Sequence, residues 1–391
     1  MNKDYNMHSH AEHGNESGIY DTIIIGAGIA GCCSAYALQQ KGQNVLLLDR
    51  SSVAASGGSG AAGAFVSPKI GKGSPLQTLT NEAFEFAKDF YLKYFPKDFY
   101  QTGVIRIPKD AEDAKKFAIY EAFNESKYRC LTQEKLEKLG IKNSEESFLF
   151  DESGVCDAPQ MCKAILEQVE FQQMDVENFK FDGEYWTIYP VSLNASLLLK
   201  AKNIILATGY QNELLDMRYM GVRGTWGSRG DYESALDLKM SMHKSISISA
   251  NINGIIKIGA SHVKTKEPCV VCDGEPLRGL FESASQMVDT SDFVLKETFC
   301  GMRSGSKDYF PLVGKVIDVP FMFENYPKIK RGAKPEFKYI DNLYVCNGLG
   351  GRGFVFAPLM AELLAECIVD GKEIDNRVNP DRLFLKWCRK L

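Results

Sequence analysis

Hydrophobic residues over the first fifty positions follow a strand–helix–strand pattern. After a polar stretch at residues 1–18, IYDTIII (19–25) is a nearly continuous apolar run, and small apolar residues recur at helical spacing over 29–40. A second apolar run, VLLLD, covers 45–49. Continuous apolar runs are typical of strands buried on both faces of a parallel sheet. The pattern predicts a β–α–β unit at the start of an α/β domain.

The later pattern alternates between helix-like and strand-like stretches. Residues 78–139 indicate a mainly helical region, and its aromatic-rich helix at 84–94 is expected in the core of a substrate domain. Residues 169–209 indicate strands that end in NIILATG, and 216–300 alternate strands with a helix near 282–288. From Leu343 the chain repeats its opening pattern, with NLYVCNG, a glycine turn and the helix PLMAELLAECIVDG.

These stretches predict two interleaved domains in an α/β protein of 391 residues. A Rossmann-like dinucleotide domain is expected from residues 19–77, 150–215 and 301–391. A substrate domain of mixed β-sheet plus helices is expected from residues 78–149 and 216–300. Residues 1–18 hold three of the five His and are interpreted as a disordered tail or tag.

The strongest motif is a glycine-rich turn between the first strand and helix. Gly26 allows a tight turn, Gly28 lets the backbone approach a pyrophosphate, and Gly31 allows close packing of helix on strand. Asp49 ends the next strand, 21 residues after Gly28, where it can accept hydrogen bonds from a ribose. A turn that only serves packing is the alternative. The residues expected to contact a dinucleotide here are Gly26, Ala27, Gly28, Ile29, Ala30, Gly31, Asp49 and Arg50.

Further small-residue segments favour FAD over NAD, because several separate contacts suit one extended dinucleotide. A Gly/Ser/Ala stretch follows the second strand, and the apolar strand at 203–209 ends in ATG. GLGGRG (348–353) opens a helix whose dipole can stabilise negative charge on a flavin. The cofactor contacts expected from these segments are Ser56, Ser59, Gly60, Ala61, Ala207, Thr208, Gly209, Gly348, Gly350, Gly351, Arg352 and Gly353.

Over residues 19–391 the chain resembles the D-amino-acid-oxidase-like superfamily of FAD oxidoreductases. GVCDAP (154–159) and GMRSGSKDYFPLVG (301–314) match two of its segments. The resemblance implies a backbone contact from Val176 to the adenine and a role for Arg303 at a substrate carboxylate. SGGSGAAGAFVSP, IGASHVKTKEP and the closing N-P-x-R-L (379–383) are most similar to the oxidoreductase domain of the MnmC family of tRNA-modifying enzymes.

The MnmC resemblance implies a specific reaction. That family removes the carboxymethyl group of 5-carboxymethylaminomethyluridine at the tRNA wobble position, which leaves 5-aminomethyluridine and glyoxylate. Arg303, Arg352 and Tyr309 are the candidate catalytic residues, with Arg223 as a further pocket residue and molecular oxygen as a candidate electron acceptor. The two arginines could instead form ordinary salt bridges. The family's two-domain members carry a methyltransferase in front, for which 18 residues leave no room.

Two other functions fit the same residues. A free amino-acid oxidase acting on glycine or sarcosine would use the same carboxylate contact and release peroxide. A flavin-binding protein without turnover, which serves as a partner, is the second alternative. No metal site is expected, although Cys269 and Cys272 have CxxC spacing with His262 nearby.

Charge and cysteine content limit the kinds of binding partner and the cellular compartment that we expect. A net charge of −4 excludes RNA binding through bulk positive charge. Any tRNA contact is expected from two local basic segments, residues 326–338 and 377–391, each with five basic residues and one acid. The apolar run at 20–38 is interrupted by three glycines, so no membrane span is expected. Eleven cysteines in a long chain without a secretory leader indicate mostly buried free thiols in the cytoplasm.

Overall fold

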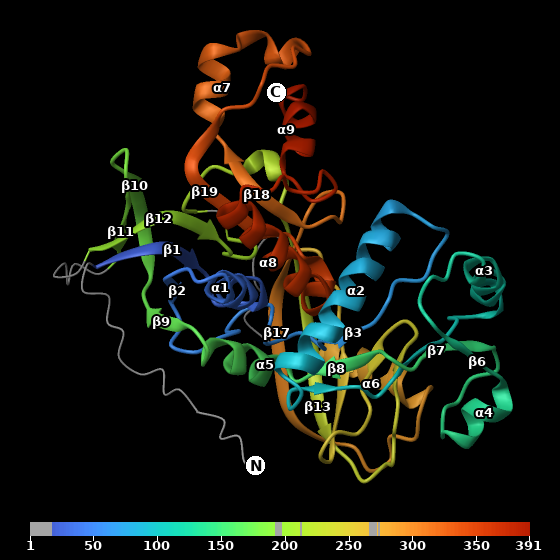
Figure 1. The fold of residues 1–391 in the computed structure, drawn as a ribbon. Helices are drawn as coiled ribbons and strands as arrows, with labels where there is room; N and C mark the ends of the chain where they lie inside the picture. The colour runs from blue at the N-terminus through green and yellow to red at the C-terminus, as the bar shows by residue number, and fades with distance from the viewer. Residues whose placement is uncertain (1–17, 192–197, 212, 266–271, 273) are drawn as a thin grey trace, which may run out of the picture.

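The computed structural model describes residues 18–191, 198–211, 213–265, 272 and 274–391. Of the expected disordered tail, residues 1–17 lie outside this range. The described chain folds around two large β-sheets and one small sheet (Figure 1). The fold class predicted from the sequence is confirmed: a Rossmann-like α/β arrangement accompanied by a mixed sheet with helices.

The first sheet carries the glycine-rich turn. Its central strands are buried and parallel, as their continuous apolar sequences predict. The parallel strands are β1 (Ile19–Ile25), β2 (Val45–Asp49), β9 (Glu170–Gln173), β12 (Leu199–Leu206) and β19 (Tyr339–Asn347). The strand order is β10-β11-β12-β1-β2-β9, and β19 pairs with the second half of β12. The antiparallel members are β10 (Val176–Phe181), β11 (Trp186–Pro190) and β18 (Leu312–Ile317).

Helices cover one face of this sheet and share its core. They are α1 (Ile29–Gln40), α2 (Pro75–Tyr94), α5 (Ala158–Leu166) and α8 (Gly353–Asp370). The placement of the α2 aromatics in the core of a substrate domain is wrong. Phe84 and Tyr91 pack in the same core as α1 and α8, and the Tyr91 hydroxyl donates a hydrogen bond to the carbonyl oxygen of Phe354 at 2.9 Å. Amphipathic spacing shows that a helix has a buried face, but not which sheet that face meets.

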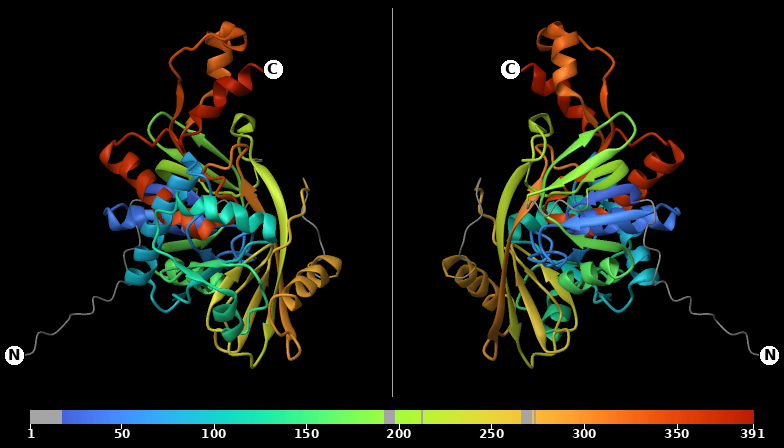
Figure 2. Two further views of the ribbon diagram at one scale, coloured as in Figure 1. Left: turned by 90° about the vertical axis from the view of Figure 1, so that its right-hand side faces the viewer. Right: turned by 90° about the vertical axis from the view of Figure 1, so that its left-hand side faces the viewer.

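The second sheet has the order β17-β13-β16-β15-β14-β5-β7-β6. Its strands are β5 (Val104–Arg106), β6 (Arg129–Leu131), β7 (Ser147–Phe150), β13 (Arg223–Glu233), β14 (Ser241–His243), β15 (Ser247–Ile248), β16 (Ile255–Gly259) and β17 (Val294–Gly305). Strands β13 and β17 pair along nearly their whole lengths and are visible side by side in Figure 2. The small sheet joins β3 (Phe65–Val66), β8 (Gly154–Cys156) and β4 (Phe99–Tyr100).

The expected helical region at 78–139 is only partly helical. Besides α2 it holds α3 (Ala111–Glu121), α4 (Gln133–Lys138) and the short strands β4, β5 and β6. Strands of two or three residues are too short to show a period of two, so the pattern hid them. The helix expected at 282–288 is α6 (Glu275–Ser285), which begins seven residues earlier.

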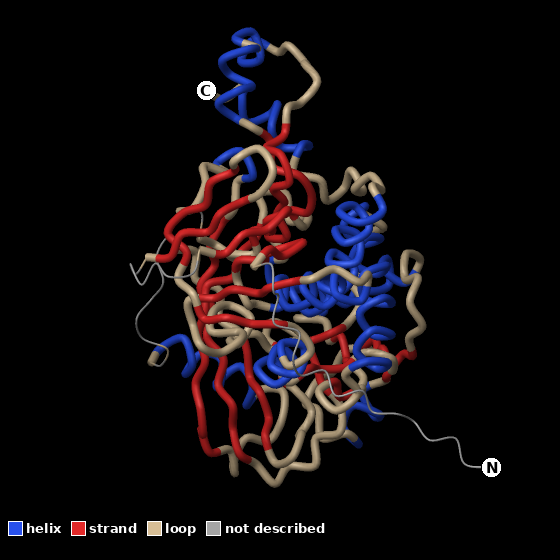
Figure 3. The backbone as a smooth tube through the Cα atoms, turned by 60° about the vertical axis from the view of Figure 1, so that its left-hand side comes forward, coloured by secondary structure: helices blue, strands red, loops and turns tan. Residues whose placement is uncertain are grey.

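Short helices stand together at one end of the molecule, above β18 and β19 (Figures 1 and 3). They are α7 (Val319–Asn325), the 3₁₀ turn η2 (Pro327–Arg331) and α9 (Asp381–Cys388), and the 3₁₀ turn η1 (Arg218–Met220) contacts α9 from below. Strand β17 crosses the domain boundary expected at residue 301, and η1 packs in the core of the first sheet. The division into two interleaved domains remains our proposal.

Within the described residues, no helix combines the length and apolar character needed to span a membrane.

Candidate functional site

A cavity of about 830 Å³ lies between the two large sheets. On one side it is lined by residues at the carboxyl ends of the parallel strands, including Ile25, Asp49, Ala207 and Asn347. Open α/β sheets bind ligands at this edge. On the other side it is lined by residues of the second sheet. The volume lies in the upper part of the range of cofactor and ligand sites, about 300–1,000 Å³.

Most of the residues that the sequence singled out come together around this cavity. Those that line it are Gly26, Gly28, Ile29, Ala30, Asp49, Arg50, Ser56, Ser59, Val176, Ala207, Thr208, Gly209, Arg303, Tyr309, Gly348, Gly350, Gly351, Arg352 and Gly353. Four others, Ala27, Gly31, Gly60 and Ala61, do not line it. Arg223 is exposed on β13 and does not line the cavity.

The glycine-rich turn is packed too closely against other backbone to admit side chains at two of its glycines. Gly26 has a φ of +112°, and a Cβ there would approach the Ala207 carbonyl oxygen to 2.5 Å. A Cβ on Gly31 would overlap the carbonyl oxygen of Gly26, so this glycine lets α1 pack against the turn. The turn therefore shows two of the glycine functions known from dinucleotide-binding turns, the tight turn at Gly26 and the close helix packing at Gly31.

Two side chains fix the backbone around the turn. Asp49 accepts hydrogen bonds from the amides of Ala27 at 2.7 Å and Ser51 at 2.8 Å. Ser59 Oγ accepts from the amide of Ile29 at 2.9 Å, at the start of α1. Helix N-termini bind phosphate through such amides and the helix dipole. These contacts hold a carboxylate and a helix N-terminus at one end of the cavity, an arrangement that fits an adenosine ribose and a pyrophosphate.

Charge is distributed unequally in the cavity wall. The acidic lining residues are Asp49 at the end of β2, Asp175 between β9 and β10, Glu177 in β10 and Glu213 after β12. Arg50 adjoins them. The remaining basic lining residues are Lys69, Arg106, Arg303 and Arg352, and none of these four forms an ion pair with a described carboxylate. We call Lys69, Arg106, Arg303 and Arg352 the cationic end of the cavity.

The cationic end shows electrostatic strain. Burial lowers the pKa of Arg106 to about 9, with a contribution from the nearby Arg352 that outweighs the opposing effect of Asp113. Burial also lowers the pKa of Arg352 to about 10. The pKa of Lys69 is lowered by burial and by both arginines. Arg352 Nη1 donates to the carbonyl oxygen of Ser67 at 3.3 Å, which brings it to the segment that carries Lys69. Partly buried like charges of this kind are stabilised by a bound anion.

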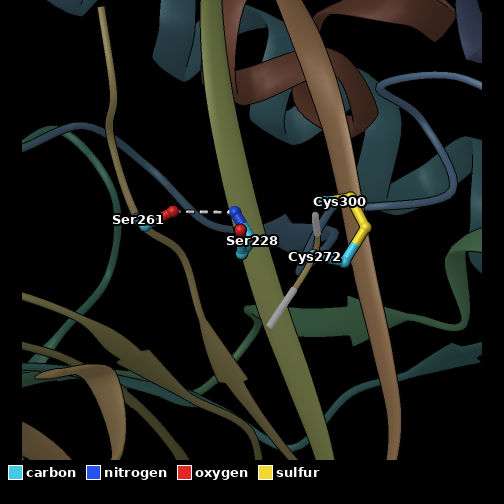
Figure 4. Close-up of a disulfide and its surroundings, with 4 residues drawn as sticks. All are labelled: Ser228, Ser261, Cys272 and Cys300. Carbon is cyan, nitrogen blue, oxygen red and sulfur yellow. Dashed lines mark hydrogen bonds between the residues drawn. A yellow bond between two sulfur atoms is a disulfide. The ribbon is translucent and has the colours of Figure 1, made fainter. Parts of the chain in front are cut away.

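Arg303 is held by a backbone contact with the segment that follows β16. Its Nη2 donates to the carbonyl oxygen of Ser261 at 2.9 Å, and burial lowers its pKa. Ser261 is itself fixed, because its Oγ accepts from the amide of Ser228 at 2.8 Å (Figure 4). His262 follows on the cavity wall, and burial together with Arg303 lowers its pKa. Its imidazole is therefore neutral at pH 7.

A disulfide lies beside these residues. Cys272 is joined to Cys300 of β17, three residues before Arg303 (Figure 4). These two cysteines are exceptions to the mostly free thiols expected from the sequence. Their Cα atoms are 5.3 Å apart, within the range that a disulfide spans. The CxxC interpretation paired Cys272 with Cys269, which lies outside the described residues. Eight other described cysteines are free, and six of them are buried, as expected.

Sequence reasoning missed several site residues. Lys69 and Arg106 belong to the cationic end, and His243 lies beside Arg106 across the parallel β5–β14 pair. Burial, Arg106 and Arg352 lower the pKa of His243 well below its ordinary value. A signal was present for Arg106, because it is the one charged residue within the apolar sequence VIRIP. No motif marked the others, which meet only through the packing of the two sheets.

Arg229 is a structural residue that the sequence also did not reveal. It is 1% exposed, pairs with Asp231 at 2.7 Å, and its guanidinium lies 4.1 Å from the ring centroid of Phe299. Its Nη1 donates to the carbonyl oxygens of Gly60 and Ala62. A buried ion pair in which every guanidinium nitrogen is hydrogen-bonded fixes geometry more than it adds stability. Arg229 thereby fastens the Gly/Ser/Ala segment to the second sheet.

Known proteins resemble this chain in both sequence and fold. A family model described as FAD dependent oxidoreductase matches residues 21–367. The bifunctional tRNA 5-methylaminomethyl-2-thiouridine biosynthesis protein MnmC of Legionella pneumophila is 24% identical over 368 residues, which cover 90% of this chain and 54% of that protein. MnmC of Idiomarina loihiensis is 26% identical over 366 residues, with 90% and 56% covered. The chain thus spans about half the length of these relatives, and the resemblance to MnmC is confirmed for that part.

Solved structures give the same fold. Glycine oxidase from Bacillus cereus superposes with a TM-score of 0.74 at 18% identity, covering 90% of this chain and 96% of that one. Iminodiacetate oxidase from Chelativorans superposes with a TM-score of 0.72 at 16% identity, covering 92% and 98%. These likenesses concern the fold. With a family match over most of its length, the chain belongs to the FAD dependent oxidoreductase family, and FAD is its cofactor.

Proposed function

We propose that this oxidoreductase removes the carboxymethyl group from 5-carboxymethylaminomethyl(-2-thio)uridine at the tRNA wobble position, which yields 5-aminomethyluridine and glyoxylate. The bond oxidised is the CH–NH bond between the secondary amine and the CH₂ that bears the carboxylate. The proposal places the enzyme in the cytoplasm, with tRNA as its substrate and oxygen as a candidate electron acceptor. Similarity to MnmC over nine-tenths of the chain supports this choice.

The cationic end of the cavity is the observation that supports a carboxylate-bearing substrate. Four basic residues face the cavity there without a carboxylate partner among the described residues. A substrate whose reacting carbon bears a carboxylate supplies the missing negative charge. Charge-assisted hydrogen bonds of arginine to a carboxylate are frequently bidentate and therefore orient the substrate as well as bind it. A substrate without an anionic group would leave these cations uncompensated.

This chain's residues would act mainly by positioning. Bound FAD supplies the hydride acceptor. Arg303 would hold the substrate carboxylate, while the Ser261 contact fixes the guanidinium. His262 is neutral at pH 7, so a ring nitrogen can accept the proton that a substrate ammonium must lose before its carbon gives up hydride. The CH₂ carbon then becomes an imine carbon, and water cleaves the imine to glyoxylate and the free primary amine.

A free amino-acid oxidase acting on glycine or sarcosine is the second candidate. The same carboxylate contact would serve it, and the fold of glycine oxidase covers nine-tenths of this chain. The cationic end favours carboxylate-bearing amines in general and does not separate the two substrates. A flavin-binding protein without turnover would need no such charged end.

One assay separates these functions. The purified FAD-loaded protein is incubated with tRNA that carries the carboxymethylaminomethyl base, and the nucleosides are analysed by mass spectrometry. We expect the modified nucleoside to lose the mass of its carboxymethyl group in exchange for hydrogen, together with stoichiometric glyoxylate. Unchanged tRNA combined with rapid oxidation of glycine or sarcosine would refute the proposal in favour of the amino-acid oxidase. Bound flavin that none of these amines reduces without oxygen would favour the non-catalytic protein.

A further inference from the structure

Four exposed basic side chains gather on the outer surface near α9. They are Arg223 at the start of β13, Lys307 after β17, and Lys386 and Lys390 at the end of the chain. None of them forms an ion pair with a carboxylate in the part of the chain that the structure describes. We call these four residues the Lys307 patch. It contrasts with a protein whose net charge is −4.

The fold brings the members of the patch together from distant parts of the sequence. Arg223 pairs with Gly305 in the β13–β17 ladder, two residues before Lys307. At the other side, Arg382 Nε donates to Asp308 Oδ2 at 2.9 Å and Nη2 donates to Asp308 Oδ1 at 3.0 Å. This ion pair fastens α9 next to Lys307.

The last two lysines come from α9 and from the turn that follows it. Lys386 follows Arg382 by four residues in α9, so it lies on the side of the helix that contacts Asp308, and Lys390 lies two residues after the end of α9. These side chains lie near Lys307 and lower its pKa. Lys390 is the main cause, and Lys386 and Arg223 contribute further. Like charges held this near one another are unfavourable unless an anion compensates them.

An exposed aromatic ring joins the patch to the cavity. Tyr309 is 76% exposed, has a φ of +69°, and lies two residues after Lys307. Tyr309 also lines the cavity, so it lies at the opening. Exposed rings beside a basic surface are the arrangement on which unpaired bases of RNA loops stack.

We propose that the Lys307 patch is the docking surface for the phosphates of a single-stranded tRNA loop, and that Tyr309 is the platform on which a loop base stacks at the cavity opening. This inference rests on the proposed function for the choice of RNA. It restricts the expected RNA contact to a small part of the two basic segments that the sequence indicated. Only Lys386 and Lys390 of those segments belong to the patch, whereas Arg377 is already paired with Glu82 and Asp375.

Equilibrium binding of a fluorescent, unmodified anticodon stem-loop to the FAD-loaded protein tests the inference. The triple variant Lys307→Gln/Lys386→Gln/Lys390→Gln removes three positive charges. We expect affinity to fall about 10–100-fold near 0.1 M salt, and the slope of log K against log salt to become shallower by about 2, since each single-strand phosphate contact contributes about 0.7. Tyr309→Ala should weaken binding about 5–100-fold without changing that slope, because stacking is not a counterion effect.

The matched control removes three positive charges from the neighbouring basic segment. Lys328→Gln/Lys330→Gln/Lys334→Gln changes the net charge equally but leaves the patch intact, and we expect wild-type affinity. Flavin absorbance and melting temperature show whether each variant is folded. Wild-type affinity in the patch variant, or an equal loss in the control, would overturn the docking surface.

The docking surface and the proposed function fail separately. RNA binding that depends on the patch, without loss of the carboxymethyl group, would refute the proposed function and support the docking surface. Loss of the carboxymethyl group from tRNA, together with unaltered RNA binding by the patch variant, would refute the docking surface and support the proposed function. A wild-type protein that does not bind the stem-loop would overturn the surface as well.

Discussion

Replacing Arg106 by glutamine should stabilise the protein and weaken its substrate binding. Burial and the neighbouring Arg352 lower the pKa of Arg106 from its ordinary value to about 9 in the folded protein. At about 1.36 kcal/mol per pKa unit this bounds the unfavourable interaction at ~5 kcal/mol, and water in the cavity screens it to ~1–2 kcal/mol. We therefore expect the melting temperature of Arg106→Gln, measured by calorimetry without substrate, to rise by about 2–4 °C at pH 7.

The pH dependence gives this prediction a second readout. Below pH 9 Arg106 is charged in both the folded and the unfolded protein, so the full penalty is present. As the pH rises through 9 the folded state releases its proton first, and the penalty declines. The difference in melting temperature between variant and wild type should narrow as the pH rises above 9. The KM for a carboxylate-bearing amine should rise about 10-fold, because one compensating cation is lost.

Arg129→Gln is the matched control for this variant. Arg129 lies on β6 of the same sheet, but its guanidinium is exposed and pairs with Asp151 at 2.6 Å. Exposed ion pairs contribute about 0–1 kcal/mol, so we expect a slightly lower melting temperature and an unchanged KM. A loss of stability in Arg106→Gln together with an unchanged KM would refute both the strain and the role of the cationic end.

Three further variants test the rest of the site. Arg303→Ala should raise the KM for the amine about 10–100-fold while the protein keeps its yellow FAD, and loss of flavin would show that its role is different. Gly31→Ala should abolish FAD binding or folding, as judged by flavin absorbance and calorimetry, because its Cβ would overlap the Gly26 carbonyl oxygen; normal FAD content would contradict that geometry. Asp49→Asn should weaken FAD binding about 10-fold in a fluorescence titration, because a charged acceptor is lost from the Ala27 amide and the ribose site. Unaltered FAD affinity would exclude Asp49 from the dinucleotide site.

The sequence by itself determined the parts of this protein that rest on local rules. Buried parallel strands need continuous apolar runs, and a turn that passes close to a phosphate needs glycines at fixed spacing. The β1–α1–β2 unit, the glycine-rich turn and the closing β19–α8 unit are therefore predictable from the order of residues alone. Family resemblance placed Arg303 at the site for the same reason, because its motif is contiguous.

The tertiary structure decided what depends on contacts between distant segments. The α2 helix joined the core of the first sheet, because a helical pattern does not name its partner. Lys69, Arg106 and Arg352 line the same cavity only because the two sheets face each other across it. The members of the Lys307 patch likewise lie together because the Asp308–Arg382 ion pair holds α9 beside the end of β17. Periodicity records which face of an element is buried, whereas long-range packing alone determines which charges become neighbours.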